Sequence, residues 1–148
     1  MVLTDRVRTT RRRLLGGGLG VATLAGCGVF RDEPKPPPAP DPLQPVLDEA
    51  LALAGAYDRV IAAQPALSAR LTPLAADHRS HAAELAKLID TKASAPPPEA
   101  VDSVAGLRAA ELAAQKTAVA ACRAAPADRA GLVGSIAACR ATHAEALR

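Results

Sequence analysis

The sequence is almost without aromatic residues: its 148 positions include one Phe, one Tyr and no Trp. β-Branched residues, which together with aromatics favour strands, are also few, whereas 36 positions are alanine, the strongest helix former. This composition excludes an all-β sandwich or barrel. It also disfavours recognition of nucleic acid by base stacking, which needs exposed aromatic rings.

Clusters of basic residues are missing after position 26. The formal net charge is +3, but residues 1–26 hold five arginines and one aspartate, which leaves 13 basic and 14 acidic residues for the rest of the chain. The positive charge therefore belongs to the N-terminal segment and does not mark a surface for nucleic acid. We expect no nucleic-acid partner.

Motifs of known catalytic machinery are missing as well. The sequence has no nucleophile elbow, no glycine-rich phosphate loop between a strand and a helix, no Cys-x-x-Cys pair and no Ser/His/Asp arrangement. The glycine run at residues 16–18 belongs to the N-terminal segment. The sequence thus offers no residues for a hydrolase, a kinase or a dehydrogenase, and we expect no catalytic residues.

The N-terminal segment has the form of an export signal. Thr10-Arg11-Arg12-Arg13-Leu14-Leu15 has the pattern of a twin-arginine signal, and the apolar run of about 12 residues that follows is shorter than the ~20 needed to span a bilayer. The run ends in Leu24-Ala25-Gly26-Cys27, which resembles a lipobox. The alternative is a plain signal anchor with an incidental cysteine. We predict a signal peptide over residues 1–26, twin-arginine export through Arg11 and Arg12, and lipidation of Cys27.

Residues 27–40 follow as the lipidated cysteine and a proline-rich tether. A run of prolines favours extended polyproline II structure and cannot pack a hydrophobic core. Two or three acyl chains on one cysteine attach a protein stably to a bilayer. The mature protein is therefore expected outside the cytoplasm, held at the cell membrane by its lipid, after passage through the twin-arginine machinery.

From residue 41 onward, apolar residues and alanines recur at helical spacing. The pattern predicts a first helix capped by Asp41 and broken at Gln64-Pro65, a second over about 66–90, a third over about 99–124, and a fourth capped by Asp128. Pro73 should kink the second helix or start its regular part. Short connections within each pair of helices produce two hairpins. We predict an all-α fold, an antiparallel four-helix bundle over residues 41–148.

The two hairpins look like a repeat. Superposing them by sequence places Glu49 on Glu111, His78 on Arg140, and His81 on His143. The histidines and the arginine lie within apolar stripes, so their side chains should point into the bundle. Because buried ionisable groups without partners cost several kcal/mol each, these side chains should contact one another, a water or a metal ion.

This arrangement resembles the ferritin-like superfamily, whose di-iron members carry a Glu on helices 1 and 3 and a Glu-x-x-His motif on helices 2 and 4. The residues that match are two single acids and two histidines: Glu49, Glu111, His81 and His143. The two motif acids are replaced by His78 and Arg140. With the signal, the tether and segments 71–74, 78–81 and 132–138, the chain is similar to exported, often lipid-anchored proteins of high-GC Gram-positive bacteria that carry a ferritin-like domain.

Two interpretations of the interior polar residues stay open. In one, a single iron, manganese or zinc ion is held by a mixed nitrogen and oxygen ligand set, namely Glu49, His78, His81, Glu111 and His143. In the other, which we favour at this point, no cofactor is bound, because Arg140 blocks a cation position and pairs with both glutamates. The favoured interpretation predicts a non-catalytic binding or structural module of the cell envelope with an unknown partner. The alternative is a metal-binding or oxidoreductase protein.

The remaining polar residues receive simpler predictions. Tyr57 should fill the interior without a specific partner, and three acids should face solvent: Asp77, Glu84 and Glu145. Cys122 and Cys139 are two cysteines in an oxidising compartment, where such pairs usually form disulfides. Their helical register, however, separates them by on the order of 10 Å, beyond the ~7 Å limit between Cα atoms. Both outcomes stay open.

Overall fold

The computed structural model describes residues 39–92 and 101–148. All four long helices lie in one compact unit, which is assigned to residues 38–148. The predicted signal with Arg11 and Arg12, the predicted lipidation site Cys27 and most of the tether lie outside the described residues. None of the described helices combines the length and hydropathy that crossing a membrane requires.

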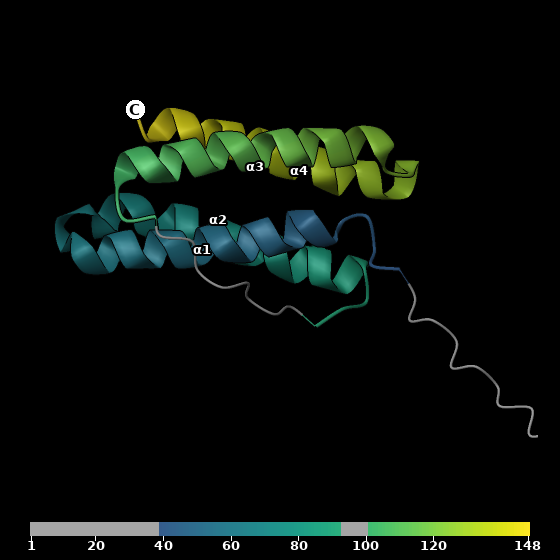
Figure 1. Cartoon of the computed structure of the whole chain (residues 1–148), viewed down its shortest axis with the longest axis horizontal. Coiled ribbons are helices and arrows are strands. Elements are labelled where there is room, and N and C mark those ends of the chain that lie inside the picture. The colour runs from purple at the N-terminus through teal and green to yellow at the C-terminus, as the bar shows by residue number, and fades with distance from the viewer. Residues whose placement is uncertain (1–38, 93–100) are drawn as a thin grey trace, which may run out of the picture. The chain divides into compact units, whose positions relative to one another are not determined.

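The described residues form four α-helices and one short 3₁₀ turn. Their bounds are α1 Gln44–Ala63, η1 Pro65–Leu67, α2 Ser68–Leu88, α3 Val104–Ala124 and α4 Ala127–Ala146. Helices α1 and α2 form one antiparallel hairpin, and α3 and α4 form the other (Figure 1). The hairpins pack face to face through α1 against α3 and α2 against α4. The predicted four-helix bundle of two hairpins is confirmed.

The helix starts differ from the predictions by a few residues. Leu43, not Asp41, is the N-cap residue of α1. The Asp41 carboxylate instead accepts a hydrogen bond from the Leu43 backbone N–H at 2.9 Å and pairs with Arg129 at 2.7 Å. Asp41 thus caps the turn before the helix, and the predicted N-cap is wrong because Pro45, rather than Pro42, stands in the first helical turn.

The second hairpin shows similar shifts. α3 begins at Val104 rather than near residue 99, because the Ser103 side chain accepts a hydrogen bond from the Gly106 N–H at 3.2 Å and caps the helix there. At α4 the N-cap position belongs to Pro126, and Asp128 lies in the first turn as an acidic residue at the positive end of the helix. Pro73 lies on the exposed side of α2, which begins already at Ser68, so it does not start the regular part of that helix.

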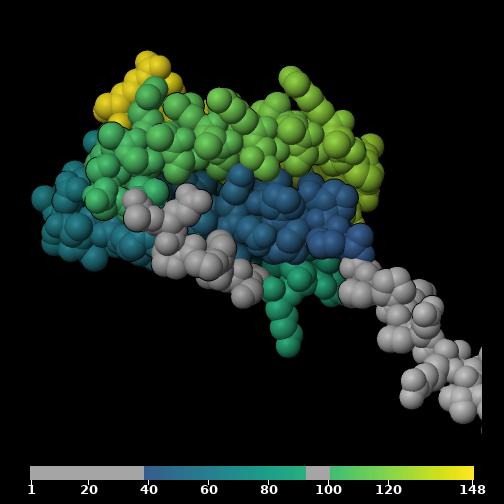
Figure 2. Space-filling model, viewed as in Figure 1, coloured from purple at the N-terminus to yellow at the C-terminus, as the bar shows by residue number. Residues whose placement is uncertain are grey.

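The core consists of two apolar clusters with polar residues between them. One cluster fills the end of the bundle near the start of α1 and includes Val46, Leu47, Ala50, Leu85, Ala118, Val133 and Ile136. The other fills the opposite end and includes Tyr57, Val60, Leu71, Leu107 and Leu147. Small side chains at the contacts let the helices approach closely, and α3 lies against α1 in the space-filling view (Figure 2). The buried polar residues lie in the middle of α2, the first half of α3 and the C-terminal half of α4.

Candidate metal centre

Four ionisable side chains are buried in the middle of the bundle. His78 on α2, Glu111 on α3 and Arg140 on α4 are fully buried, and His143 on α4 is 5% exposed. Each stands in the apolar stripe of its helix, one or two turns from fully buried Leu, Ile or Val residues. The structure therefore places these residues in the interior, where the helical periodicity predicted them.

Glu111 is the centre of this cluster. Its Oε1 atom accepts a hydrogen bond from the Tyr57 hydroxyl at 2.7 Å. The same oxygen lies 2.7 Å from His78 Nε2 and 3.1 Å from His143 Nδ1. The two ring nitrogens are 3.3 Å apart. The other oxygen of Glu111, Oε2, is buried without a hydrogen-bond partner. Three side chains, one each from α1, α2 and α4, thus converge on one carboxylate of α3.

The charges of the cluster follow from burial and from these contacts. Burial alone would raise the pKa of Glu111, but the hydrogen bonds from His143 and His78 outweigh it and lower that pKa to about 2. Burial also acts to lower the pKa of His143, but the hydrogen bond to Glu111 raises it above the ordinary value. For His78 burial prevails, and its pKa is lowered. Near neutral pH, Glu111 is a carboxylate and His78 is neutral.

Tyr57 is buried in the interior as predicted, but the expected lack of a partner is wrong, because its hydroxyl donates to Glu111. Burial, and then the neighbouring Glu111 charge, raise the pKa of Tyr57 far above its ordinary value, so the phenol stays neutral and acts as a donor. A signal for this contact exists in the sequence. Tyr57 lies two helical turns after Glu49, on the same face of the first helix, and is the only tyrosine.

Arg140 forms a separate pair with Glu49. Its Nη1 atom donates to Glu49 Oε2 at 2.8 Å and to the Ala114 carbonyl at 2.8 Å, and Nη2 donates to the Val46 carbonyl at 3.0 Å. The expectation that Arg140 pairs with both glutamates is therefore correct for Glu49 only. Glu111 Oε1 contacts Tyr57 and the two histidines instead, and the charge of Glu111 acts on Arg140 without a hydrogen bond.

A hollow of about 230 Å³ lies between α1 and α3 and reaches Glu49. Its walls are mostly alanine, and the Glu49 side chain is 31% exposed, whereas that of Arg140 is fully buried. Burial raises the pKa of Glu49, and a hydrogen bond from Thr117 and the charge of Arg140 act against this rise. The Arg140–Glu49 pair is thus buried on its cationic side and open on its anionic side.

Three of the five predicted metal ligands come together. Ligand atoms of His78, Glu111 and His143 all lie within 4.8 Å of one another. Glu49 is engaged by Arg140 instead. His81 lies beside His78, with ring centroids 6.2 Å apart, and its Nδ1 atom is buried without a hydrogen-bond partner.

A second group of ligand atoms surrounds the other nitrogen of His143. His143 Nε2 lies 3.2 Å from Asp77 Oδ2 and 3.3 Å from Cys139 Sγ. Asp77 is exposed as predicted, yet it contacts His143, a partner that its helical position alone did not reveal. Burial, reinforced by the charges of Asp77 and Glu111, raises the pKa of the Cys139 thiol. Glu84 and Glu145 are exposed as predicted and pair with Lys87 and Arg148.

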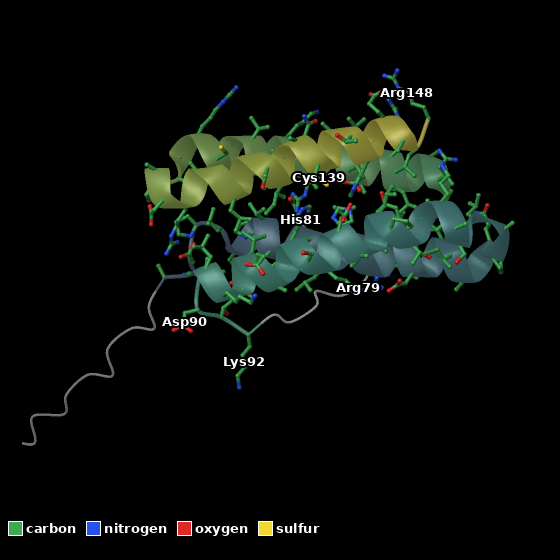
Figure 3. The ribbon with its side chains drawn as sticks, turned by 180° about the vertical axis from the view of Figure 1, so that it is seen from behind. Arg79, His81, Asp90, Lys92, Cys139 and Arg148 are labelled. Atoms are coloured by element: carbon green, nitrogen blue, oxygen red, sulfur yellow. The ribbon has the colours of Figure 1, made fainter. Side chains whose placement is uncertain are left out.

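Neither described cysteine forms a disulfide. Cys122 and Cys139 are both free thiols, as their helical register indicates. The Cys122 sulfur lies 3.4 Å from the Ala130 carbonyl, at the end of the bundle near the α3–α4 turn. Figure 3 shows Cys139 on the side of α4 that faces the first hairpin and His81 on the side of α2 that faces the second hairpin. The two cysteines therefore have different surroundings and no shared partner.

The inner group fits one metal ion and does not fit two. Bonds of about 2.0–2.2 Å from nitrogen and oxygen to a divalent ion place neighbouring ligand atoms about 2.8–3.6 Å apart at octahedral to tetrahedral angles, and the three ligand atoms are 2.7, 3.1 and 3.3 Å apart. A second cation next to Glu49 would meet the guanidinium of Arg140.

No family model matches the chain, and no curated protein or solved structure matches it. The resemblance to ferritin-like proteins thus stays a prediction from the sequence.

Proposed function

We propose that this protein binds one divalent transition-metal ion inside its helical bundle, through His78, Glu111 and His143. The observation that carries this proposal is the convergence of two imidazole nitrogens on one ionised carboxylate whose second oxygen is buried without a partner. Two histidines and one carboxylate are a ligand set found in zinc and non-haem iron sites. The proposal thus puts the metal-binding interpretation of the sequence ahead of the one in which Arg140 blocks the cation position and no cofactor is bound.

The contacts of Arg140 support this choice. The interpretation without a metal ion requires that the Arg140 guanidinium neutralise both Glu49 and Glu111. Of the two glutamates, Arg140 contacts only Glu49, so the hydrogen-bond partners of Glu111 are Tyr57 and ring protons of the imidazoles rather than a guanidinium. A metal ion takes the place of such ring protons when it binds. The residues present therefore offer a charge-compatible position for one divalent ion.

A bound ion would supply Lewis acidity, with coordination positions left open beside its three protein ligands. The chain's own contribution is to fix those ligands. Tyr57 of α1 donates a hydrogen bond to Glu111, and Asp77 contacts the Nε2 atom of His143. These contacts fix the orientation of two of the three ligands. No catalytic residue is assigned.

The proposal places this domain outside the cytoplasm, tethered to the cell membrane by a lipid on Cys27. The support is the run from Arg11 to Leu15, the short apolar stretch and the Leu24-Ala25-Gly26-Cys27 sequence. Twin-arginine export carries folded proteins, often with a cofactor already inserted, which suits a protein that binds its ion before it leaves the cytoplasm.

A non-catalytic binding or structural module is the second candidate. One observation favours it: Tyr57, His78 and His143 can all donate to Glu111, so this carboxylate has partners even without an ion. In that case the network would serve only to fix the register of the four helices.

Mn²⁺ is the first probe for the two candidates, because it binds carboxylate ligands and binds thiolates weakly. Mn²⁺ should raise the melting temperature of the full chain and bind with a stoichiometry of one in calorimetric titration. The near-isosteric Glu111→Gln variant should lose both effects, whereas His81→Ala, a change at a histidine outside the group, should keep them. No binding of Mn²⁺, Co²⁺ or Zn²⁺ by the wild type, or equal binding by Glu111→Gln of every ion that the wild type binds, would rule out metal binding at this group.

A further inference from the structure

We infer that Asp77, Cys139 and His143 form a second metal site, which takes a thiophilic divalent ion such as Zn²⁺. One ligand atom of each of these residues lies within 4.8 Å of the others, and His143 Nε2 lies 3.2 Å from Asp77 Oδ2 and 3.3 Å from Cys139 Sγ. Cys139 and His143 are four residues apart on α4, so they share one face of that helix, and Asp77 approaches from α2. One sulfur, one nitrogen and one oxygen ligand form a set that zinc accepts readily.

The hydrogen-bonding capacity of His143 points to an ion at this place. Its Nε2 atom has two neighbours at hydrogen-bond distance, a carboxylate oxygen and a thiol sulfur. A single ring nitrogen carries either one proton or one lone pair, so it cannot serve both neighbours fully. A divalent ion bound to all three atoms satisfies every one of them and releases the thiol proton to solvent.

The second site is accessible from solvent, unlike the inner one. The Asp77 side chain is 56% exposed, and Cys139 is partly buried, whereas His78 and Glu111 are fully buried. An ion at this outer site therefore has room for a water ligand in its fourth position, and it can enter without opening the bundle. We call it the outer site and the group around Glu111 the inner site.

The two sites share one imidazole. His143 turns Nδ1 toward Glu111 and Nε2 toward Asp77 and Cys139. A ring that keeps one proton coordinates through one nitrogen at a time. Ions at the inner and outer sites therefore exclude each other. This exclusion rests on the proposed function, whereas the outer site itself does not.

Co²⁺ tests the outer site directly, because a thiolate bound to Co²⁺ gives a charge-transfer band in the near ultraviolet. The chain has no Trp and one Tyr, so this region is nearly free of protein absorption. In the full chain with Cys27→Ser, Cys122 and Cys139 are the only thiols. The band should appear with one Co²⁺, disappear with excess Zn²⁺, be lost in Cys139→Ser and remain in the matched control Cys122→Ser.

Alkylation of the protein without changes at Cys122 and Cys139 provides a second measurement that does not depend on variant folding. Since the free thiolate is the reactive species, Zn²⁺ should slow iodoacetamide modification of Cys139 by on the order of tenfold or more and leave that of Cys122 unchanged. Absence of the band at saturating Co²⁺, its loss in Cys122→Ser, or equal protection of both cysteines would each overturn the outer site. A band that persists in Glu111→Gln, together with equal binding of Mn²⁺, Co²⁺ and Zn²⁺ by the wild type and Glu111→Gln, would reject the inner site and keep the outer one.

Discussion

Arg140 of α4 reaches across the bundle and binds Glu49 of α1, with 2.8 Å between Nη1 and Oε2. The same guanidinium donates to the Val46 carbonyl on α1 and to the Ala114 carbonyl on α3. One buried cation thus connects three helices from both hairpins. Because Arg140 occupies the interior next to Glu49, an ion in the interior would have to lie on the other side, around Glu111.

The first prediction concerns removal of this cation. Arg140→Met keeps an apolar side chain of similar length but leaves Glu49 and two carbonyl groups without their donor. Breaking a buried ion pair of this kind costs about 3–5 kcal/mol, and urea unfolding should show a loss of this order. Glu49→Gln should cost less, since the Glu49 side chain is 31% exposed. A loss below about 1 kcal/mol for Arg140→Met would contradict the bridging role.

The second prediction isolates the hydrogen bond from Tyr57 to Glu111. Tyr57→Phe removes one donor to an ionised, buried carboxylate and leaves the ring packing intact. Hydrogen bonds to charged groups contribute about 1.5–3 kcal/mol, so the free energy of unfolding should fall by this amount. In the Glu111→Gln background the same change should cost less, because the acceptor is then neutral. A double-mutant cycle with no coupling would show that Tyr57 only fills space.

The third prediction is a loss of stability at acid pH. The pKa of Glu111 in the folded protein is about 2, below its ordinary value of 4.5. The ionised form therefore stabilises the folded state at and above pH 4.5, and this contribution disappears as the pH falls through 4.5 toward 2. The difference corresponds to roughly 3 kcal/mol. Urea unfolding between pH 7 and pH 2 should show this loss in the wild type, and Glu111→Gln should flatten it.

The fold could be predicted from the sequence because it depends on repeated local signals. Alanine and leucine at helical spacing, with breaks at Gln64-Pro65 and Pro126, determine four helices and two short connections. The helix starts were less predictable, since several residues can cap the same turn. Asp41 and Ser103 both accept backbone hydrogen bonds, but only Ser103 is the N-cap of its helix.

The burial of the site residues could be predicted from the sequence, but their contact partners could not. Periodicity places His78, Arg140 and His143 in the interior, and it does so correctly. It does not determine which acid each one meets, because that depends on the rotation of each helix and on competition for one oxygen. Three side chains contact the Oε1 atom of Glu111, whereas Arg140 pairs with Glu49. The contact of Asp77 with His143 likewise arises only when two helices pack.

The fourth prediction concerns export and anchoring. Cys27→Ala should release the protein from the membrane fraction, because the thioether that carries the lipid cannot form. The double substitution Arg11→Lys and Arg12→Lys should block export, although the total charge of the signal is unchanged. Fractionation and lipid labelling measure the first effect, and a signal-peptide reporter measures the second. Membrane retention of labelled Cys27→Ala protein would exclude lipidation at this cysteine, and export of the double-lysine form would exclude the twin-arginine route alone.

The last prediction changes the number of ions that the bundle can hold. Arg140→Glu removes the cation from the position next to Glu49 and places a third carboxylate near Glu49 and Glu111, three residues before His143. Without metal, like-charge repulsion and the lost donor to Glu49 should destabilise this variant more than Arg140→Met does. A divalent ion should then restore stability, by about 2.7 kcal/mol when its concentration is 100 times its dissociation constant. Thermal unfolding with and without Mn²⁺ should therefore show a larger rise in Tm for Arg140→Glu than for the wild type, and titration should give up to two ions. An equal rise in both proteins would mean that Arg140 does not occupy a cation position.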